Sequence, residues 1–158
     1  MESIKMLVMD VDGTLTDGTI YLSAEGETVK GFHVKDGYAI ARLSRKGILT
    51  AVLTGRRSQI VARRAEELGI AVVRQGIADK AAELSAIAAE YQLALTQIAY
   101  IGDDLNDLGC MKLCGATGAP ADAADEIKET ADFVSTKEGG RGAVREFVDW
   151  LLCRDRQT

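Results

Sequence analysis

The hydrophobic positions of the chain follow two patterns, short continuous apolar runs and longer segments with apolar residues at helical spacing. The runs predict strands at residues 4–10, 48–54, 70–74, 98–103 and 131–135. The helical segments lie at residues 38–46, 58–69, 78–91, 105–113, 121–129 and 142–153. Because continuous apolar runs are typical of strands buried on both faces, this alternation predicts an α/β fold with a mostly parallel sheet covered by helices on both sides.

One segment departs from this alternation. Residues 19–34 have the sequence TIYLSAEGETVKGFHV, in which apolar positions flank the turn residues AEG. This pattern predicts a β-hairpin that projects from the sheet. The 158 residues suffice for one sizeable core, so we expect a single domain over residues 1–158 that finishes with a loop and helix at about 136–158.

The composition narrows the function classes. A formal net charge of -5 argues against nucleic acid and anionic membranes as partners, because the average surface would repel them. The apolar run after Lys5 is too short for a signal peptide or a spanning helix, so we expect a cytoplasmic protein. Cys110 and Cys114 have no nearby histidine or CxxC partner, which favours core packing over metal binding.

Polar side chains stand where three predicted strands end. Asp10 ends the first run, Thr54 the second and Asp103 the fourth, while Lys80 opens the helix before that fourth strand. Ligands bind beyond the carboxyl ends of parallel strands, so we expect these side chains to meet. Each of these residues alone could be a helix cap or a solvated loop residue, but the four together favour a functional site.

The clustered carboxylates indicate a metal. Two carboxylates about 4 Å apart repel by roughly 4 kcal/mol at an effective dielectric constant of about 20, so a cluster needs a cation between its members. Oxygen ligands alone predict Mg²⁺, which fills its remaining positions with water and substrate phosphate. The expected substrate is therefore a phosphate.

Each residue then receives an expected role. Asp10 can attack phosphorus and form an aspartyl-phosphate, while Asp12, two residues along an extended turn, can protonate the leaving alcohol and then activate water. The groups expected to bind the phosphoryl oxygens are the Thr54 hydroxyl, the Gly55 amide and the Lys80 ammonium.

The motifs DVDGTLT at 10–16, LTGR at 53–56, Lys80 and GDDLND at 102–107 resemble the four ordered motifs of the haloacid dehalogenase superfamily, phosphatase branch. The resemblance implies a Rossmann-like three-layer sandwich, and an acid at position 12 argues against dehalogenation. It also implies Mg²⁺ held by the Asp10 side chain, the Asp12 carbonyl and Asp103. Asp104 and Asp107 could add contacts near the metal or simply cap the helix that follows.

No cap domain is expected. Many members of this superfamily carry one, but residues 17–53 have room only for the hairpin and one helix. Such an open site acts on a large partner or receives its lid from another subunit. The hairpin offers edge strands for pairing with neighbours, and residues 139–152 place a flexible, cationic, Gly-rich loop before the terminal helix.

A narrower resemblance concerns the substrate. The segments FHVKDGYAI at 32–40, TGRRS at 54–58 and GGRGAVRE at 139–146 are similar to the capless tetrameric phosphatases acting on 3-deoxy-D-manno-octulosonate 8-phosphate. This implies a homotetramer with a lid from neighbouring subunits and a small phosphorylated sugar acid as partner. The residues implied to contact substrate are Asp12, His33, Val34, Lys35, Asp36, Gly37, Gly55, Arg56, Arg64, Lys80 and Arg141.

Two departures keep alternatives open. His33 stands where the family usually has Asn, and Ala41 stands where it has an arginine that contacts substrate, so a nonulosonate 9-phosphate is an alternative substrate. His33 could instead be a satisfied hairpin residue, and Arg141 and Arg145 could be solvated. Arg141 otherwise pairs with the sugar carboxylate, in its own or a neighbouring site. Other possible functions are a non-catalytic phospho-ligand sensor, an activator of a nucleotidylyltransferase and a phosphoprotein phosphatase.

Overall fold

The computed structural model describes residues 3–154 and contains a six-stranded sheet in the order β5-β4-β1-β6-β7-β8, with every neighbouring pair parallel. The strands are β1 (Met6–Met9), β4 (Leu49–Leu53), β5 (Val72–Arg74), β6 (Ile98–Ile101), β7 (Ala116–Ala119) and β8 (Phe133–Val134). The helices are α1 (Val34–Arg45), α2 (Gln59–Leu68), α3 (Lys80–Glu90), α4 (Leu108–Met111), α5 (Asp125–Thr130) and α6 (Ala143–Arg154), with 3-10 turns η1 (Leu95–Gln97) and η2 (Leu105–Asp107).

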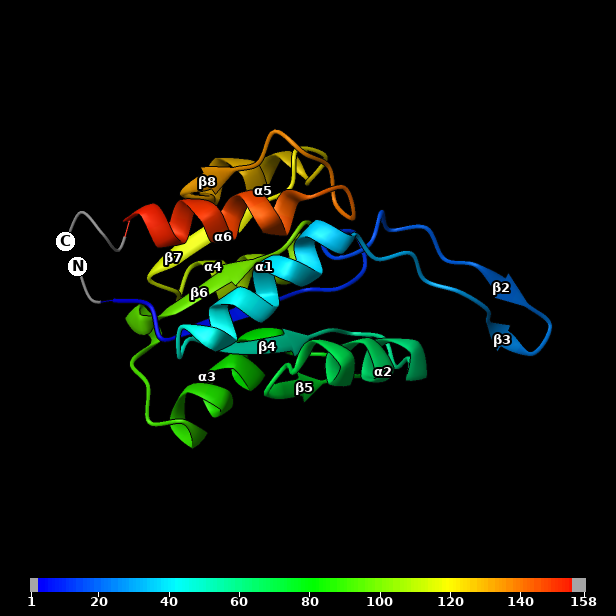
Figure 1. The fold of residues 1–158 in the computed structure, drawn as a ribbon, viewed down its shortest axis with the longest axis horizontal. Coiled ribbons are helices and arrows are strands. Elements are labelled where there is room, and N and C mark those ends of the chain that lie inside the picture. Colours follow the sequence, from blue (N-terminus) through cyan, green and yellow to red (C-terminus); the bar gives the residue numbers. More distant parts are fainter. Residues whose placement is uncertain (1–2, 155–158) are drawn as a thin grey trace.

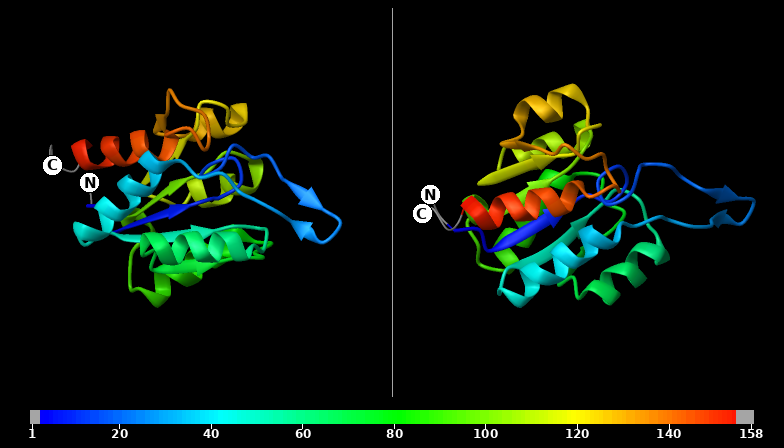
Figure 2. Two further views of the ribbon diagram at one scale, coloured as in Figure 1. Left: turned by 45° about the vertical axis from the view of Figure 1, so that its right-hand side comes forward. Right: turned by 45° about the horizontal axis from the view of Figure 1, so that its top comes forward.

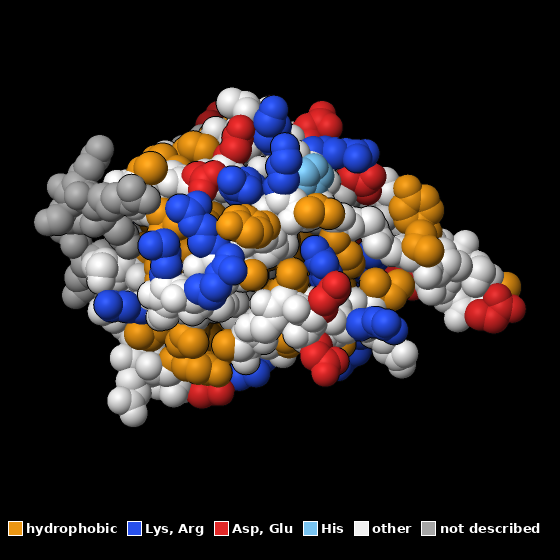
Figure 3. All heavy atoms as spheres, viewed as in Figure 1, with side chains coloured by type: hydrophobic (Ala, Val, Ile, Leu, Met, Phe, Trp, Pro, Cys, Tyr) orange, Lys and Arg blue, Asp and Glu red, His pale blue; other side chains and the backbone are white. Residues whose placement is uncertain are grey.

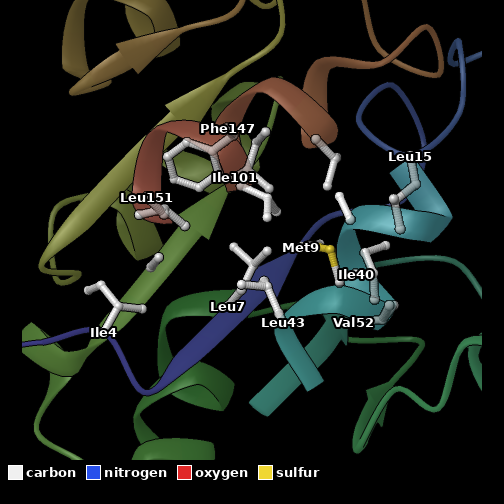
Figure 4. Close-up of a cluster of buried hydrophobic side chains, with 14 of the residues drawn as sticks. Ile4, Leu7, Met9, Leu15, Ile40, Leu43, Val52, Ile101, Phe147 and Leu151 are labelled. Carbon is white, nitrogen blue, oxygen red and sulfur yellow. The ribbon is translucent and has the colours of Figure 1, made fainter. Parts of the chain in front are cut away.

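Helices cover both faces of the sheet, as Figures 1 and 2 show. Leu7 and Met9 of β1 point into a core formed with α1, α2 and α6, which Figure 4 shows in close-up. Met6 and Val8 alternate to the other face, where they pack with α3, α4 and α5. The predicted α/β three-layer fold is therefore confirmed.

Some predicted boundaries were wrong. Strand β7 was missed because its sequence, ATGA, consists of small residues without an apolar run. The helix predicted at 105–113 is divided into η2 and α4. The helix predicted at 38–46 begins four residues earlier, because the His33 side chain accepts the backbone N–H of Lys35 and caps it.

The predicted hairpin projects beyond the carboxyl ends of the strands, far from the two termini (Figure 1). Its paired part is short, with β2 (Leu22–Ser23) antiparallel to β3 (Gly26–Glu27). Within residues 3–154, the chain between β1 and β4 contains this hairpin and α1 and has no cap domain. The domain limits 1–158 stay a prediction, since residues 1–2 and 155–158 lie outside the described residues. None of the described helices is both long and apolar enough to cross a lipid bilayer.

Candidate active site

Three neighbouring strands end at one edge of the sheet and bring three of the predicted site residues together. Asp10 follows β1 directly, and its backbone N–H donates to the Ile101 carbonyl oxygen of β6 at 3.0 Å. Asp103 follows β6 and Thr54 follows β4, the two strands that flank β1. These three residues line one cavity of about 160 Å³ together with Asp12, Gly55, Arg56, Asp104 and Asn106.

Lys80 supplies a positive charge next to Asp10, which lines this cavity. It is the first residue of α3, and its side chain is only 2% exposed. Its Nζ lies 2.7 Å from an oxygen of Asp10 and 2.8 Å from an oxygen of Asp107. A buried ammonium between two carboxylates keeps all three groups in fixed positions, because each would be costly to leave unpaired.

Asp107, whose role the sequence left open, is a positioning residue. It is fully buried, and its Oδ1 accepts hydrogen bonds from Lys80 and from the Tyr100 hydroxyl at 2.6 Å. Its Oδ2 accepts the backbone N–H groups of Asp103 at 3.0 Å and Asp104 at 3.2 Å. Asp107 therefore holds both the lysine and the loop that carries Asp103. The Asp104 side chain accepts the N–H of Leu105 at the start of η2.

The acidic side chains fit a divalent cation. One carboxylate oxygen from each of Asp10, Asp103 and Asp107 lies within 4.8 Å of the others. Because Asp107 already accepts from four donors, Asp10 and Asp103 are the side chains with capacity to bind a metal. Oxygen donors next to a polar cavity suit Mg²⁺.

The electrostatics of the two carboxylates agree with this reading. Burial raises the pKa of Asp10 to about 6, with the Asp107 charge adding to the effect and Lys80 opposing it. Burial, followed by the hydrogen bond and the charge of Asp10, raises the pKa of Asp103 to about 8. Both ionised forms are thus disfavoured until a cation offsets their charge.

This arrangement predicts a pH-dependent stabilisation by magnesium. An acid whose pKa is raised in the folded state lowers stability as pH rises, because the folded chain binds more protons. For Asp10 and Asp103 this loss spans roughly pH 4 to 8. Melting temperatures in chelator should fall between pH 6 and 8, and the increase produced by Mg²⁺ should be larger at pH 8 than at pH 6. An equal increase at both values would contradict the assignment.

Gly13 allows the loop that follows β1 to approach Asp103 closely. Its φ is +91°, and a Cβ at this position would lie 2.0 Å from a carboxylate oxygen of Asp103. Next to it, the Thr14 hydroxyl donates to the other oxygen of Asp103 at 3.3 Å. The glycine of the DVDGT motif is therefore required by the contact between the loop that follows β1 and the loop that carries Asp103.

The Gly-rich C-terminal loop packs against the same loop after β1. The Gly140 N–H donates to the Thr14 carbonyl oxygen at 3.1 Å, and a Cβ at Gly139 would lie 1.8 Å from the Gly13 carbonyl oxygen. The Gly139 N–H also donates to Asp122 at 2.9 Å. The expectation of a flexible loop is therefore wrong for these two glycines, which serve close packing.

The structure reveals one charged residue at the site that the sequence did not indicate. Lys30, on the return arm of the hairpin, lies 2.5 Å from the Asp12 carboxylate and 2.8 Å from Glu27. Lysine in a hairpin is ordinarily solvent-exposed, and no local spacing distinguishes this one from a surface residue. Lys30 and Asp12 are 18 positions apart in the sequence, so their contact can be recognised only in the folded structure.

The predicted substrate contacts at 33–37 form the start of α1 and do not line the acidic cavity. Val34 is exposed, whereas Asp36 is buried and accepts the Arg145 N–H at 2.8 Å, which caps the start of α6. A Cβ at Gly37 would lie 2.5 Å from the Arg64 guanidinium. In this chain Asp36 therefore connects α1 to the start of α6, and Gly37 allows α1 to pack closely against the Arg64 side chain of α2.

The predicted arginines occupy two further places. Arg64 lies 5.6 Å from the centre of the Phe32 ring, in a small pocket between α1 and α2. Arg141 is mostly exposed and lies 3.9 Å from Asp17. A separate cationic groove is lined by His33, Lys35, Lys137, Arg141, Arg145 and three neighbours, Gly142, Glu146 and Asp149. Figure 3 shows Lys and Arg side chains gathered over α1 and α6 on this side of the molecule.

Comparison with known proteins identifies relatives of this fold and site. The family model of the haloacid dehalogenase-like hydrolases matches residues 70–147. The chain is 43% identical over 150 residues to 3-deoxy-D-manno-octulosonate 8-phosphate phosphatase KdsC of Yersinia pestis, covering 95% of this chain and 80% of that protein. A crystal structure of the Yersinia pestis phosphatase has a TM-score of 0.93 at 42% identity, covering 97% of this chain and 83% of that one.

A second relative carries ligands. The phosphatase of the same name from Moraxella catarrhalis, solved in complex with magnesium ion, phosphate ion and a KDO molecule, has a TM-score of 0.92 at 41% identity and covers 95% of this chain and 86% of that one. The metal predicted from the acidic strand ends is thus the one present in this relative. The chain belongs to the haloacid dehalogenase-like hydrolases and is a phosphoric monoester hydrolase related to the 3-deoxy-D-manno-octulosonate 8-phosphate phosphatases.

Proposed function

We propose that this protein hydrolyses 3-deoxy-D-manno-octulosonate 8-phosphate with Mg²⁺ as cofactor. The observation that carries the proposal is the convergence of Asp10 and Asp103 on one cavity, with Lys80 paired to Asp10, in a chain 43% identical to a phosphatase named for that substrate. Membership of a hydrolase family favours turnover over a non-catalytic phospho-ligand-binding module. The open cavity is also compatible with an exposed phosphoprotein, which the substrate screen below includes.

In the proposed reaction the Asp10 carboxylate attacks phosphorus, forming an aspartyl-phosphate as the bond to the sugar oxygen breaks. Asp12 gives a proton to that oxygen and then takes one from the water that hydrolyses the aspartyl-phosphate, releasing phosphate and regenerating Asp10. Thr54, Gly55 and Lys80 bind the phosphoryl oxygens. Magnesium, when held by Asp10, Asp103 and the Asp12 carbonyl, offsets the negative charge of the carboxylates and the phosphoryl group.

The subunit arrangement is part of the proposal. Several large apolar side chains are exposed on the hairpin and the start of α1, namely Tyr21, Leu22, Val29, Val34 and Tyr38. A homotetramer in which these surfaces are buried would bring the hairpin of one subunit over the open cavity of another and supply a lid. The cationic groove, which includes Arg141, would then offer a partner for the sugar carboxylate in its own or a neighbouring site.

Leu22→Asp tests the assembly. Leu22 is 66% exposed at the hairpin, so a charge there should disrupt a subunit contact without affecting the core. We expect smaller assemblies by sedimentation and at least a tenfold loss of turnover on the sugar-acid phosphate. Glu25→Asp, in the turn of the same hairpin, is the matched control. An unchanged sedimentation coefficient in Leu22→Asp would exclude this contact.

A phosphate-release screen tests the substrate. It compares octulosonate 8-phosphate, nonulosonate 9-phosphates, common sugar phosphates and a phosphopeptide, each with and without a magnesium chelator. We expect the eight-carbon ester to give the highest kcat/KM and chelator to abolish turnover. The presence of His33 and Ala41 favours the phosphates of nine-carbon acids as the second candidate substrates. A higher kcat/KM for these esters would mean that one of them, and not the eight-carbon ester, is the substrate.

A further inference from the structure

The hairpin brings the Lys30 side chain to the loop that follows β1, where Glu27 of the same hairpin also contacts it. Lys30 Nζ lies between Oδ1 of Asp12, at 2.5 Å, and Oε1 of Glu27, at 2.8 Å. The Lys30 side chain is 1% exposed, and the two carboxylates are 19% and 16% exposed. These three charges therefore form a mostly buried triad between the hairpin and the loop that follows β1, where charge pairing is stronger than at the surface.

The triad is also attached to the rigid part of the fold. The second oxygen of Glu27 accepts the Ser58 hydroxyl hydrogen at 2.5 Å. Ser58 caps α2 by accepting the Val61 N–H at 3.3 Å, and its own N–H donates to Gln75 at 2.7 Å. A continuous path of polar contacts thus runs from the start of α2 through Glu27 and Lys30 to Asp12.

The charge on Lys30 is well compensated. Burial disfavours the ammonium, but the hydrogen bonds to Asp12 and Glu27 and their negative charges outweigh burial and raise the pKa of Lys30. A lysine that stays charged at every working pH acts as a fixed donor. Its position also differs from that of Lys80, which contacts Asp10 and Asp107, so the two lysines hold different carboxylates.

We propose that Lys30 is a positioning residue, which holds the Asp12 carboxylate in the orientation that delivers its proton to the leaving oxygen. The inference rests on the proposed function, because it assumes that Asp12 is the acid. Lys30 engages Oδ1 of Asp12, so Oδ2 is the oxygen that carries the proton to the leaving group, and Asp12 also lines the cavity shared with Asp10 and Asp103. Loss of this donor would leave the acid present but free to rotate, which weakens proton transfer without removing the nucleophile.

The leaving group distinguishes this role from a purely structural one. A sugar alkoxide needs a proton as it departs, whereas 4-nitrophenolate is stable enough to leave without one. We therefore expect Lys30→Met to slow single-turnover release of the sugar from octulosonate 8-phosphate by roughly 10²-fold, a typical share of general acid catalysis. Release of nitrophenolate from 4-nitrophenyl phosphate, measured in the same way, should slow less than about fivefold. Single turnover isolates this step from hydrolysis of the aspartyl-phosphate, in which Asp12 acts again.

The controls use the same chain. Lys128→Met removes a surface lysine of α5 and should leave both rates unchanged. Lys30→Gln, which is shorter and uncharged, replaces the Met variant if melting shows that Lys30→Met does not fold, and the same selective loss is expected. In an Asp12→Asn background, Lys30→Met should slow sugar release by less than about threefold, since coupled residues are not additive.

Three results would overturn the inference. Equal slowing of both esters would mean that Lys30 acts on the metal, the phosphoryl group or the fold. Full additivity with Asp12→Asn would mean that it does not act through Asp12. Failure of the wild-type protein to hydrolyse either ester in Mg²⁺ would instead remove the proposed function, and this inference with it.

Discussion

Asp10→Asn is expected to abolish turnover, by roughly 10⁴-fold or more, while the protein stays folded. The amide has nearly the shape of the carboxylate but cannot form the aspartyl-phosphate. Lys80 still finds Asp107 at 2.8 Å, so the buried lysine keeps a charged partner. Burial is the main cause of the raised pKa of Asp103, and the hydrogen bond and charge of Asp10 add to it, so the substitution also removes part of the charge repulsion at the site. The melting temperature in chelator should therefore equal or exceed that of the wild type.

Phosphate release measures the expected loss of turnover, and thermal melting measures the expected stability of Asp10→Asn. Asp125→Asn is the matched control, because Asp125 has an 86% exposed side chain on α5, away from the cavity residues. It should retain wild-type turnover and stability. Normal hydrolysis by Asp10→Asn would exclude Asp10 as the nucleophile, and an unfolded variant would show that Lys80 depends on Asp10 for its stability.

Lys80→Met is expected to affect both catalysis and stability. The methionine fills similar space but leaves Asp10 and Asp107 as buried carboxylates without their shared cation. Removal of one partner from a buried ion pair costs about 3–5 kcal/mol, because the remaining charge is uncompensated. Turnover should fall by roughly 10²-fold or more, since the proposed donor to the phosphoryl oxygens is lost.

A double variant separates these two effects. Lys80→Met with Asp107→Asn removes one of the stranded charges, so urea denaturation should show a partial recovery of stability. Turnover should not recover, because the lysine is still absent. If Lys80→Met unfolds at the same urea concentration as the wild type, Lys80 is not needed to compensate the buried charges of Asp10 and Asp107.

The sequence predicted the part of the site that depends on local patterns. Asp10 and Asp103 follow apolar runs directly, and parallel strands deliver their ends to one edge, so their meeting follows from pattern and topology. Strand β7 could not be predicted in this way, since its alanines, threonine and glycine give no apolar run. The early start of α1 was missed because a histidine cap and a glycine in the first turn are weak helix signals.

The contacts that the sequence did not predict are long-range charge pairs. Asp107 meets Lys80 across 27 positions, and Lys30 meets Asp12 across 18. Neither pair has a sequence spacing that distinguishes it from surface charges. The resemblance did assign roles to Asp36 and Arg64, but their contacts within this chain are to the start of α6 and to Phe32. Their proposed contacts with substrate remain predictions.

The central claim is that Asp10 and Asp103 gather around one divalent ion at the edge of the sheet. The most direct measurement is anomalous diffraction from crystals soaked in Mn²⁺, an ion that accepts the same oxygen ligands as Mg²⁺. The account predicts a single strong peak about 2.2 Å from a carboxylate oxygen of each residue. A peak elsewhere, or none at this position in crystals that contain the ion, would contradict it.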